Sequence, residues 1–420
     1  MGPLYLWGGG SVPARVHMAG GQLTRQEAED GCVLREAHLL VNSDPAEVAP
    51  SLRRRPCDFV EFHCMLVRTA LLDGGALLDT DIHCVHEHID LSLALEARGA
   101  LTWFEPASVV NYQAFAPLAL PDLPLYRARW SIAAAEHSIA AFCAKWRVLD
   151  DERSFGDVRD FVRYHVASLD PLRPEAEGRD REQPLRADEL TQTRSALFDL
   201  ALARGYPAND LAQMAHVYNL ALVLLDGYRP CGRPFLNHLC GTAGVLLRYD
   251  FRVELVAAAL LHAVYTHCPP HSGGPAPALA IVRAALGGAG TPLERRVRAY
   301  TLREGTTRPA ALPPFDQLDV LDAEVLMLTA ANEIDMHLSG EFRYSGRSDG
   351  ISDELLRRIE QVAAVIGVPG LAASLAQARA ASATVPGALI TQRAASYRIG
   401  PDRRSMLPMA SNVPMLLRED

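Results

Sequence analysis

One stretch of this sequence, residues 253–265, is apolar on nearly every face of the helix that its periodicity predicts. Val253, Val256 and Leu260 follow the spacing of a single helical face, while the opposite side carries further apolar residues together with His262. A helix that lacks a polar face has to be covered by other elements. The stretch therefore predicts a helical domain with a buried central helix, in which the imidazole of His262 requires a polar partner.

The sequence offers that partner on the preceding predicted helix, where His238 follows a turn. The matching residues are Arg229, Gly232, Pro234, Phe235 and His238, and then Ala258, Ala259, Leu260, Leu261 and His262. In this order they resemble the first half of the hydrolase-type HD domain of the (p)ppGpp synthetase/hydrolases. The resemblance implies an all-α HD-like helical domain over residues 188–380. It also implies that His238 and His262 help to hold a divalent metal, and that Arg229 and Arg233 contact a nucleotide.

The chain departs from the HD pattern at its carboxylates. Ala263 stands where the family has its metal-bridging aspartate, and Asn332 occupies the place of the last ligand aspartate. Asp335, one helical turn further on, is an acid that could replace the lost ligand. Three interpretations stay open for this domain: a metal-dependent phosphohydrolase acting on a nucleotide, a non-catalytic module that binds a nucleotide or a partner, and two core histidines hydrogen-bonded to Asn332, Thr242 or each other.

Residues 1–167 combine predicted strands and helices in an order that resembles a second family. The matching positions are Arg68, Leu78, Asp79, Glu87, His88, Ile89, Asp90, Leu91, Gly99, Pro106, Ser108, Val109 and Val110. They resemble the acceptor-side half of family-2-type glycosyltransferases with the GT-A fold. In that half a strand ending in Arg leads to a turn, a Glu-Asp-x-Asp-Leu motif opens a helix, and a strand ending in Pro follows. The resemblance implies an incomplete GT-A-like α/β domain.

The activity implied by this second resemblance is transfer of a sugar from a nucleotide-sugar donor to an acceptor hydroxyl. Glu87, His88 and Asp90 would be catalytic, with His88 in place of the usual aspartate base. Arg68 and Asp79 would contact the substrate. The donor half of the family, with its Asp-x-Asp metal site, would precede residue 1. We therefore expect either an N-terminally shortened transferase or a remnant that serves another purpose.

A run of potential metal ligands precedes the predicted helix at residues 91–98. His83, His86, Glu87 and His88 have spacing that could bind a metal ion. The alternative is a solvated loop, in which acidic residues favour the N-terminus of the following helix.

Composition limits the classes of partner and compartment. The net charge of −9, from 50 acidic and 41 basic residues, argues against bulk nucleic-acid binding. No N-terminal signal is visible, and the longest apolar run contains Glu254 and His262, so we expect no membrane span and a cytoplasmic protein. The eight cysteines form no C-x-x-C pair, which favours thiols, most of them buried, in a reducing compartment.

Local patterns complete the predicted organisation. Residues 168–187 are charged, contain proline and lack an apolar period, which predicts a linker. Residues 381–420 lack periodicity and predict a loosely packed tail. Residues 58–68 are rich in strand formers and predict a central strand, and residues 102–112 predict a strand, a proline turn and another strand.

Overall fold

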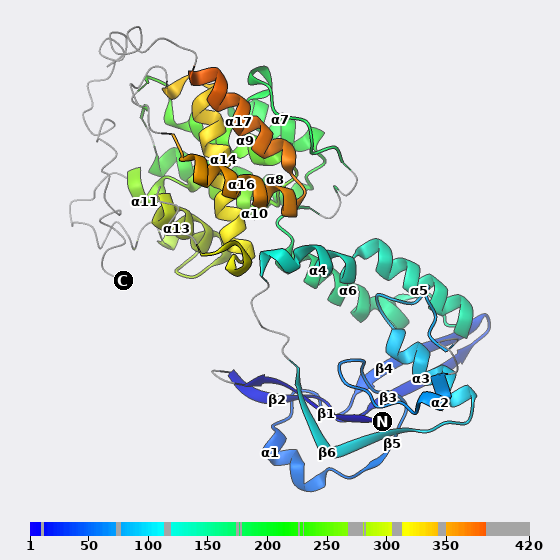
Figure 1. Cartoon of the computed structure of the whole chain (residues 1–420). Helices are drawn as coiled ribbons and strands as arrows, with labels where there is room; N and C mark the ends of the chain where they lie inside the picture. The colour runs from blue at the N-terminus through cyan, green and yellow to red at the C-terminus, as the bar shows by residue number, and fades with distance from the viewer. Residues whose placement is uncertain are drawn as a thin grey trace. The chain divides into compact units, whose positions relative to one another are not determined.

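The computed structural model describes residues 1–9, 12–72, 77–112, 119–173, 176, 179–225, 227–229, 231–267, 280, 283–304, 313–342 and 350–383 (Figure 1). The chain forms two compact units. The N-terminal unit comprises Met1–Pro117 and Pro124–Leu169, and the C-terminal unit comprises Leu118–Leu123 and Asp170–Asp420.

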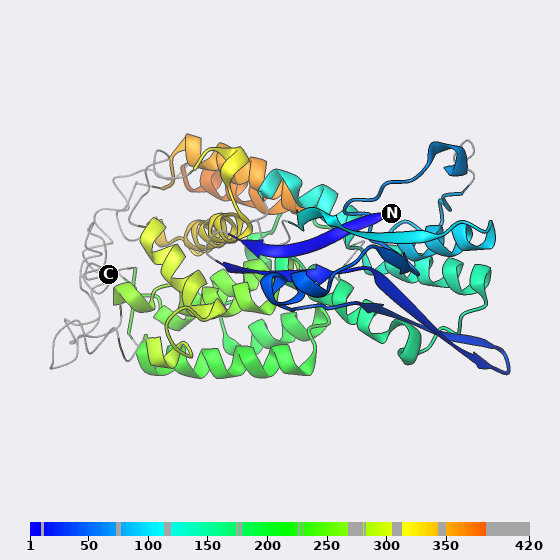
Figure 2. The same ribbon diagram turned by 90° about the horizontal axis from the view of Figure 1, so that it is seen from below.

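The N-terminal unit is built on a four-stranded sheet with the order β2-β1-β6-β5. Its strands are β1 (Gly2–Gly9), β2 (Val12–Met18), β5 (Arg55–Cys57) and β6 (Thr102–Tyr112). The long strands β1 and β6 pair in parallel, whereas β2 and β5 add antiparallel edges. A separate hairpin of β3 (Gly21–Ala28) and β4 (Gly31–His38) projects away from this sheet (Figure 2).

Helices complete the N-terminal unit and bury its aromatic residues. They are α1 (Pro45–Val48), α2 (Thr69–Leu72), α3 (Glu87–Ala97), α4 (Leu123–Arg129), α5 (Ile132–Trp146) and α6 (Glu152–Leu169), with a 3₁₀ turn at Ala49–Ser51. The 3₁₀ turn at Leu120–Asp122 belongs to the C-terminal unit. Ser131 caps α5 by accepting a hydrogen bond from the Ala134 amide. Ile89 of α3 and Phe142 of α5 are fully buried and join Phe59 in one core.

Two strand predictions for this unit are wrong. Residues 58–68 form turns and coil with one isolated bridge, because the strand ends at Cys57 and the buried Phe59 fills the core instead. Residues 102–112 form the single strand β6 without a turn. Pro3 of β1 pairs with Glu105 and the next residue, Leu4, pairs with Val109. Residues 106–108 of β6, which include Pro106, therefore bulge out of the ladder.

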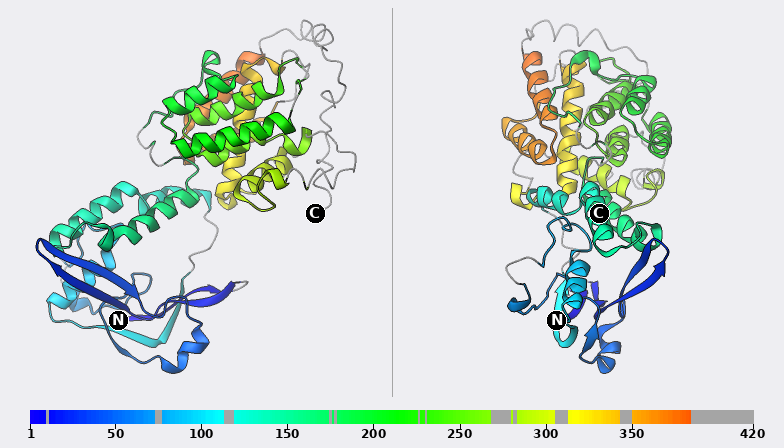
Figure 3. Two further views of the ribbon diagram at one scale, coloured as in Figure 1. Left: turned by 180° about the vertical axis from the view of Figure 1, so that it is seen from behind. Right: turned by 90° about the vertical axis from the view of Figure 1, so that its right-hand side faces the viewer.

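The C-terminal unit is helical. Its α-helices include α7 (Arg194–Ala203), α8 (Ala208–Leu224), α9 (Phe235–Arg248), α10 (Val253–Leu261), α11 (Val264–His267), α13 (Pro292–Glu304), α14 (Val320–Leu338), α16 (Asp353–Ile366) and α17 (Pro369–Ala383), with 3₁₀ turns at Ala187–Glu189 and Phe315–Gln317. Helix α14 lies between α16 and α17 on one side and α9 and α10 on the other (Figure 3).

The predicted buried central helix is confirmed for residues 253–261, which form α10, whereas the chain turns at His262 and Ala263 before α11. Each residue of α10 except Glu254 is buried, and the helix packs against α8, α9, α13 and α14. Because α10 has no polar face, it must be covered on all sides, and these four helices cover it.

The segment expected as a linker is bonded to the C-terminal unit. Arg173 donates its amide to the Asp250 carbonyl at 3.0 Å, and Gly370 donates to the Arg181 carbonyl at 3.0 Å. The Leu185 amide donates to Ser374 Oγ at 2.7 Å, and the Leu185 side chain is buried. The described residues of the segment 170–187 thus belong to the C-terminal unit.

The structure also bears on the expectations about a membrane span, the cysteines and the C-terminal tail. No helix of the described residues is both long and apolar enough to cross a membrane. The seven cysteines that are described are all free, but only Cys32, Cys84 and Cys240 are buried. Helix α17 continues to Ala383, and the rest of the expected tail lies outside the described residues.

Candidate metal centre

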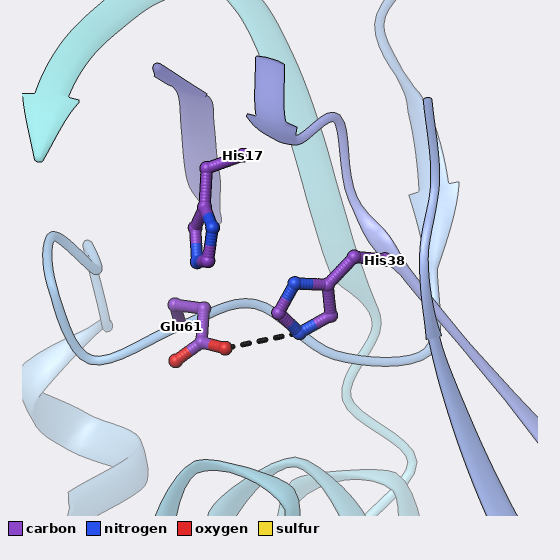
Figure 4. A group of neighbouring side chains, drawn as sticks. All are labelled: His17, His38 and Glu61. Atoms are coloured by element: carbon purple, nitrogen blue, oxygen red, sulfur yellow. Dashed lines mark ion pairs between the residues drawn. The ribbon is translucent and has the colours of Figure 1, made fainter. Parts of the chain in front are cut away.

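Three side chains that the sequence did not single out meet in the N-terminal unit. They are His17 of β2, His38 at the end of β4 and Glu61 of the loop after β5 (Figure 4). One nitrogen or oxygen atom from each lies within 4.8 Å of the other two. His38 Nε2 is 3.1 Å from Glu61 Oε1, and the His17 and His38 ring centroids are 5.0 Å apart.

Backbone pairing brings these three positions together. The Ala19 amide donates to the Leu39 carbonyl at 3.0 Å, which sets the end of β4 beside the end of β2. The Gly21 amide donates to the Phe59 carbonyl at 3.0 Å, which draws the loop carrying Glu61 to the same place. A Cβ at position 21 would overlap the Phe59 ring, so this close approach requires glycine.

The electrostatics of the cluster favour a charged carboxylate and a neutral imidazole. Burial opposes ionisation of Glu61, but the imidazoles of His88, His38 and His63 together hold its pKa well below its usual range. Burial, reinforced by the positive charge of His38, lowers the pKa of His17 to about 4. Nε2 of His17 is buried and has no hydrogen-bond partner among the described residues. Its lone pair is available to a cation, which would relieve the cost of leaving it unpaired.

His88 of α3 reaches the same cluster from the other side. Its Nε2 lies 3.7 Å from Glu61 Oε1 and 3.7 Å from Glu36 Oε2, too far for hydrogen bonds but within ion-pair range. Burial lowers the pKa of His88, but the two carboxylates outweigh it and raise the pKa to about 9. His88 is therefore protonated near neutral pH, whereas the predicted role of general base needs the neutral ring.

The other residues predicted to be catalytic are held in pairs within the unit. Glu87 Oε1 accepts a hydrogen bond from Arg129 Nη2 at 2.9 Å. Asp90 is buried and accepts from Trp146 Nε1 at 2.7 Å and from Lys145 Nζ at 3.0 Å, which ties α3 to α5. These two carboxylates are occupied by cations and an indole of their own unit.

The two predicted substrate contacts of this unit do not converge with the cluster. Asp79 accepts from Lys145 Nζ at 3.0 Å, on the network that also holds Asp90. The Arg68 side chain is exposed. Neither residue joins His17, His38 and Glu61 in the arrangement described above.

The run from His83 to His88 does not form the metal site that its spacing suggested. His86 has a left-handed backbone, with φ of 63°, and its buried ring packs on Phe142 and Phe155. His83 lies beside His137, with 6.2 Å between ring centroids. Only His88 reaches the cluster around Glu61, so the metal interpretation of this run is wrong.

The C-terminal unit does bring His238 and His262 together, as the sequence predicts. Their Nε2 atoms are 3.3 Å apart, and both rings are buried. Nδ1 of His262 donates to the Ala259 carbonyl at 2.7 Å, while Nδ1 of His238 lies 2.7 Å from Asp335 Oδ2. The carboxylate that contacts His238 is thus that of the fully buried Asp335, the acid that the sequence offered as a replacement for the lost ligand.

This arrangement fits a hydrogen-bonded core better than a metal site. The two nitrogens of an imidazole lie on opposite edges of the ring, so Asp335 and His262 flank His238 on opposite sides. No single ion could be bound by all three, and Ala263 supplies no ligand. Arg233 also donates two bonds to Asp335, at 2.7 and 2.9 Å. The interpretation of histidines bonded to each other is the one that the geometry supports.

The predicted nucleotide contacts of this unit are internal as well. Arg229 is buried and donates from Nε and Nη2 to Glu341 Oε1 at 2.9 and 2.6 Å. Arg233 is directed to Asp335 and to the Asn237 carbonyl, the latter at 2.8 Å. Both arginines join helices of the unit, and the expectation that they bind substrate is not supported by these contacts.

No protein-family model, curated protein or solved structure matches this chain.

Proposed function

We propose that the N-terminal unit binds a divalent transition-metal ion through His17, His38 and Glu61, and serves in transfer of a sugar from a nucleotide-sugar donor to an acceptor hydroxyl. The observation that carries the metal site is the buried, unpartnered Nε2 of His17 beside a carboxylate held in its charged form. The resemblance of residues 1–167 to the acceptor side of glycosyltransferases carries the class of reaction.

The residue types fit such an ion. Imidazole nitrogens suit zinc, iron and related divalent ions, and a carboxylate adds the negative charge that a catalytic site of three protein ligands commonly has. With three ligands from the protein, at least one coordination position stays open for a substrate oxygen. A metal bound there would supply positive charge for the diphosphate of a donor, the task that the Asp-x-Asp metal site has in the family that residues 1–167 resemble.

The neighbouring residues have roles that follow from their contacts. His38 Nε2 lies 3.1 Å from Glu61 Oε1, and the neutral ring would exchange this contact for the ion that His38, Glu61 and His17 hold together. His88, protonated and 3.7 Å from Glu61, adds a positive charge that favours an anionic ligand at this place. His63 stacks on Tyr112 with 4.0 Å between ring centroids, and its ring centroid lies 5.7 Å from that of His17, so it forms a wall of the cluster.

For the C-terminal unit we propose a non-catalytic role. The opposite placement of Asp335 and His262 about His238 supports a structural network. The alternative of an HD-type phosphohydrolase needs one point that all ligands reach, which this arrangement lacks. Hydrolysis of nucleotides that is lost in His262→Gln, but kept in Glu61→Gln, would overturn this proposal.

The test of the N-terminal site is release of nucleoside diphosphate from a panel of sugar nucleotides, with added zinc or manganese and with a chelator. Loss of an outer-shell partner alone costs a metal site about 10–100-fold, so Glu61→Gln should lower turnover at least about 100-fold. His137→Ala is the matched control, because that side chain is 59% exposed in the same unit. Turnover that survives both the chelator and Glu61→Gln contradicts the metal site. If the chain binds a metal but turns over no sugar nucleotide, the proposed sugar transfer is contradicted and the metal site is not.

A further inference from the structure

The C-terminal unit contains a second concentration of charge, around the buried carboxylate of Asp250. This residue lies between α9 and α10 and has a left-handed backbone, with φ of 60°. Its Oδ1 accepts from Arg204 Nε at 3.0 Å and from Arg179 Nη1 at 3.3 Å. Its Oδ2 accepts from Arg181 Nε at 3.2 Å and also from Arg204. Three guanidinium groups thus share one carboxylate.

The acceptor is saturated, but the donors are not. A carboxylate offers about four lone-pair positions, and the four contacts to Asp250 fill them. Other bonds from these arginines go to backbone carbonyls, such as Arg179 Nη1 to Arg204 at 2.8 Å and Arg181 Nη2 to Ala176 at 2.7 Å. Within the described part of the chain, Nη2 of Arg179, Nη1 of Arg181 and Nη1 of Arg204 donate to no acceptor.

The cluster reaches solvent mainly at Arg179. The Arg179 side chain is 35% exposed, while those of Arg204 and Arg181 are 18% and 13% exposed. Arg173 lies against the same carbonyls, since its Nη2 donates to Gly205 at 2.6 Å and its Nη1 to Arg204 at 3.0 Å. The arginines therefore present surplus positive charge at the partly exposed side chain of Arg179.

We propose that Arg179, Arg181 and Arg204 bind an anionic ligand that carries a phosphate group. One carboxylate offsets one of three positive charges, and the guanidinium groups that remain repel each other at close range. A guanidinium presents paired N–H groups that match the oxygens of phosphate, and it is always charged. A second anion at the exposed edge would offset the repulsion and satisfy the spare donors.

Binding there would stabilise the C-terminal unit. The three arginines come from two places, with Arg179 and Arg181 in the segment before α7 and Arg204 at the end of α7, while Asp250 lies between α9 and α10. A ligand that contacts Arg179 and Arg204 would hold these two places together beside Asp250. A ligand that binds only the folded unit raises its thermal midpoint in proportion to the logarithm of ligand concentration.

The experiment is calorimetric titration of the full chain with inorganic phosphate, pyrophosphate and a nucleoside diphosphate, at constant ionic strength. A chelator is present throughout, so that no metal at His17, His38 and Glu61 contributes. We expect saturable binding of one ligand per chain, and Arg179→Gln should weaken it by about tenfold or more, as loss of a charged hydrogen bond does. Arg186→Gln is the control, because it removes the same charge from a side chain that is 70% exposed.

The outcomes separate clearly. Equal weakening by Arg179→Gln and Arg186→Gln, or no saturable binding of any of the three ligands, overturns the proposal. Equal affinity for pyrophosphate and the nucleoside diphosphate supports a site for the phosphate group alone, and tighter nucleotide binding supports a nucleotide site. Arg179→Lys keeps the charge without the paired donors. It should preserve the thermal midpoint of the free protein while losing part of the ligand-induced rise, which excludes misfolding as the cause.

Discussion

Asp335 gives the sharpest test of how the C-terminal unit is held together. Its carboxylate is fully buried and accepts two bonds from Arg233 and one from His238. In Asp335→Asn the amide keeps the shape but loses the charge, and its nitrogen faces donors instead of accepting from them. Arg233, whose side chain is only 9% exposed, is then left without its counter-ion.

The expected magnitude follows from burial. Breaking a buried ion pair by removing one partner costs about 3–5 kcal/mol, because the other charge stays buried and uncompensated. For a domain of roughly 150–250 residues, each kcal/mol moves the thermal midpoint by about 2–4 °C. Asp335→Asn should therefore lower the midpoint of the C-terminal unit by about 6–20 °C. Asp353→Asn, at a side chain that is 91% exposed, should change the free energy of unfolding by no more than about 0.5 kcal/mol.

The chain provides separate signals for its two units. All four tryptophans, at positions 7, 103, 130 and 146, lie in the N-terminal unit. Far-ultraviolet circular dichroism is dominated by helices, so it follows mainly the C-terminal unit. We expect Asp335→Asn to shift the dichroism transition and leave the tryptophan transition unchanged. A shift below about 1 kcal/mol would refute the structural role. Adding Arg233→Met should recover part of the loss, since it removes the stranded charge.

Three further predictions concern the same unit. Gly241→Ala should lower the free energy of unfolding by about 1–3 kcal/mol, because the added Cβ would overlap Asp335 Oδ1; Gly350→Ala, with its nearest neighbours at 3.7 Å, should be near neutral in the same urea titration. Burial lowers the pKa of His337 to about 4, so the unfolded chain takes up this proton first as the pH falls, and stability should drop by up to about 1.4 kcal/mol per unit between about pH 6.5 and pH 4. His337→Gln should flatten that part of the profile, and an unchanged slope would contradict the assignment. Glu341→Gln should cost about 3–5 kcal/mol by removing the carboxylate charge that faces the buried Arg229, and a loss no larger than that of Asp353→Asn would contradict it.

Local periodicity was enough to predict the centre of the C-terminal unit. The apolar faces of residues 253–265 required a buried helix, and its one histidine required a partner that His238 supplies. The sequence placed Asn332 in the ligand set and offered Asp335 as the acid that could replace the lost carboxylate, and it is Asp335 that contacts His238. The two positions share one inward face of α14, and an acid on such a face is a signal for a buried pair. Gly241 of α9 leaves the space that the Asp335 carboxylate fills, because a Cβ at this position would overlap Asp335 Oδ1.

The metal centre had no such signal. His17, His38 and Glu61 are far apart along the chain, and none stands in a spacing that a metal motif would show. They meet because β2, the β3–β4 hairpin and the loop after β5 pair through backbone bonds, which side-chain patterns do not specify. The compact run from His83 to His88 looked more like a ligand set, yet a left-handed residue at His86 directs its ring into the core.

Metal stoichiometry tests the central claim most directly. The chelator-treated protein is titrated with cobalt(II) or zinc(II), and bound metal is counted by elemental analysis. The arrangement of His17, His38 and Glu61 predicts one ion per chain, lost in His17→Ala and in Glu61→Gln and retained in His262→Gln. A chain that binds no ion, or one whose ion persists in His17→Ala and disappears in His262→Gln, would contradict it.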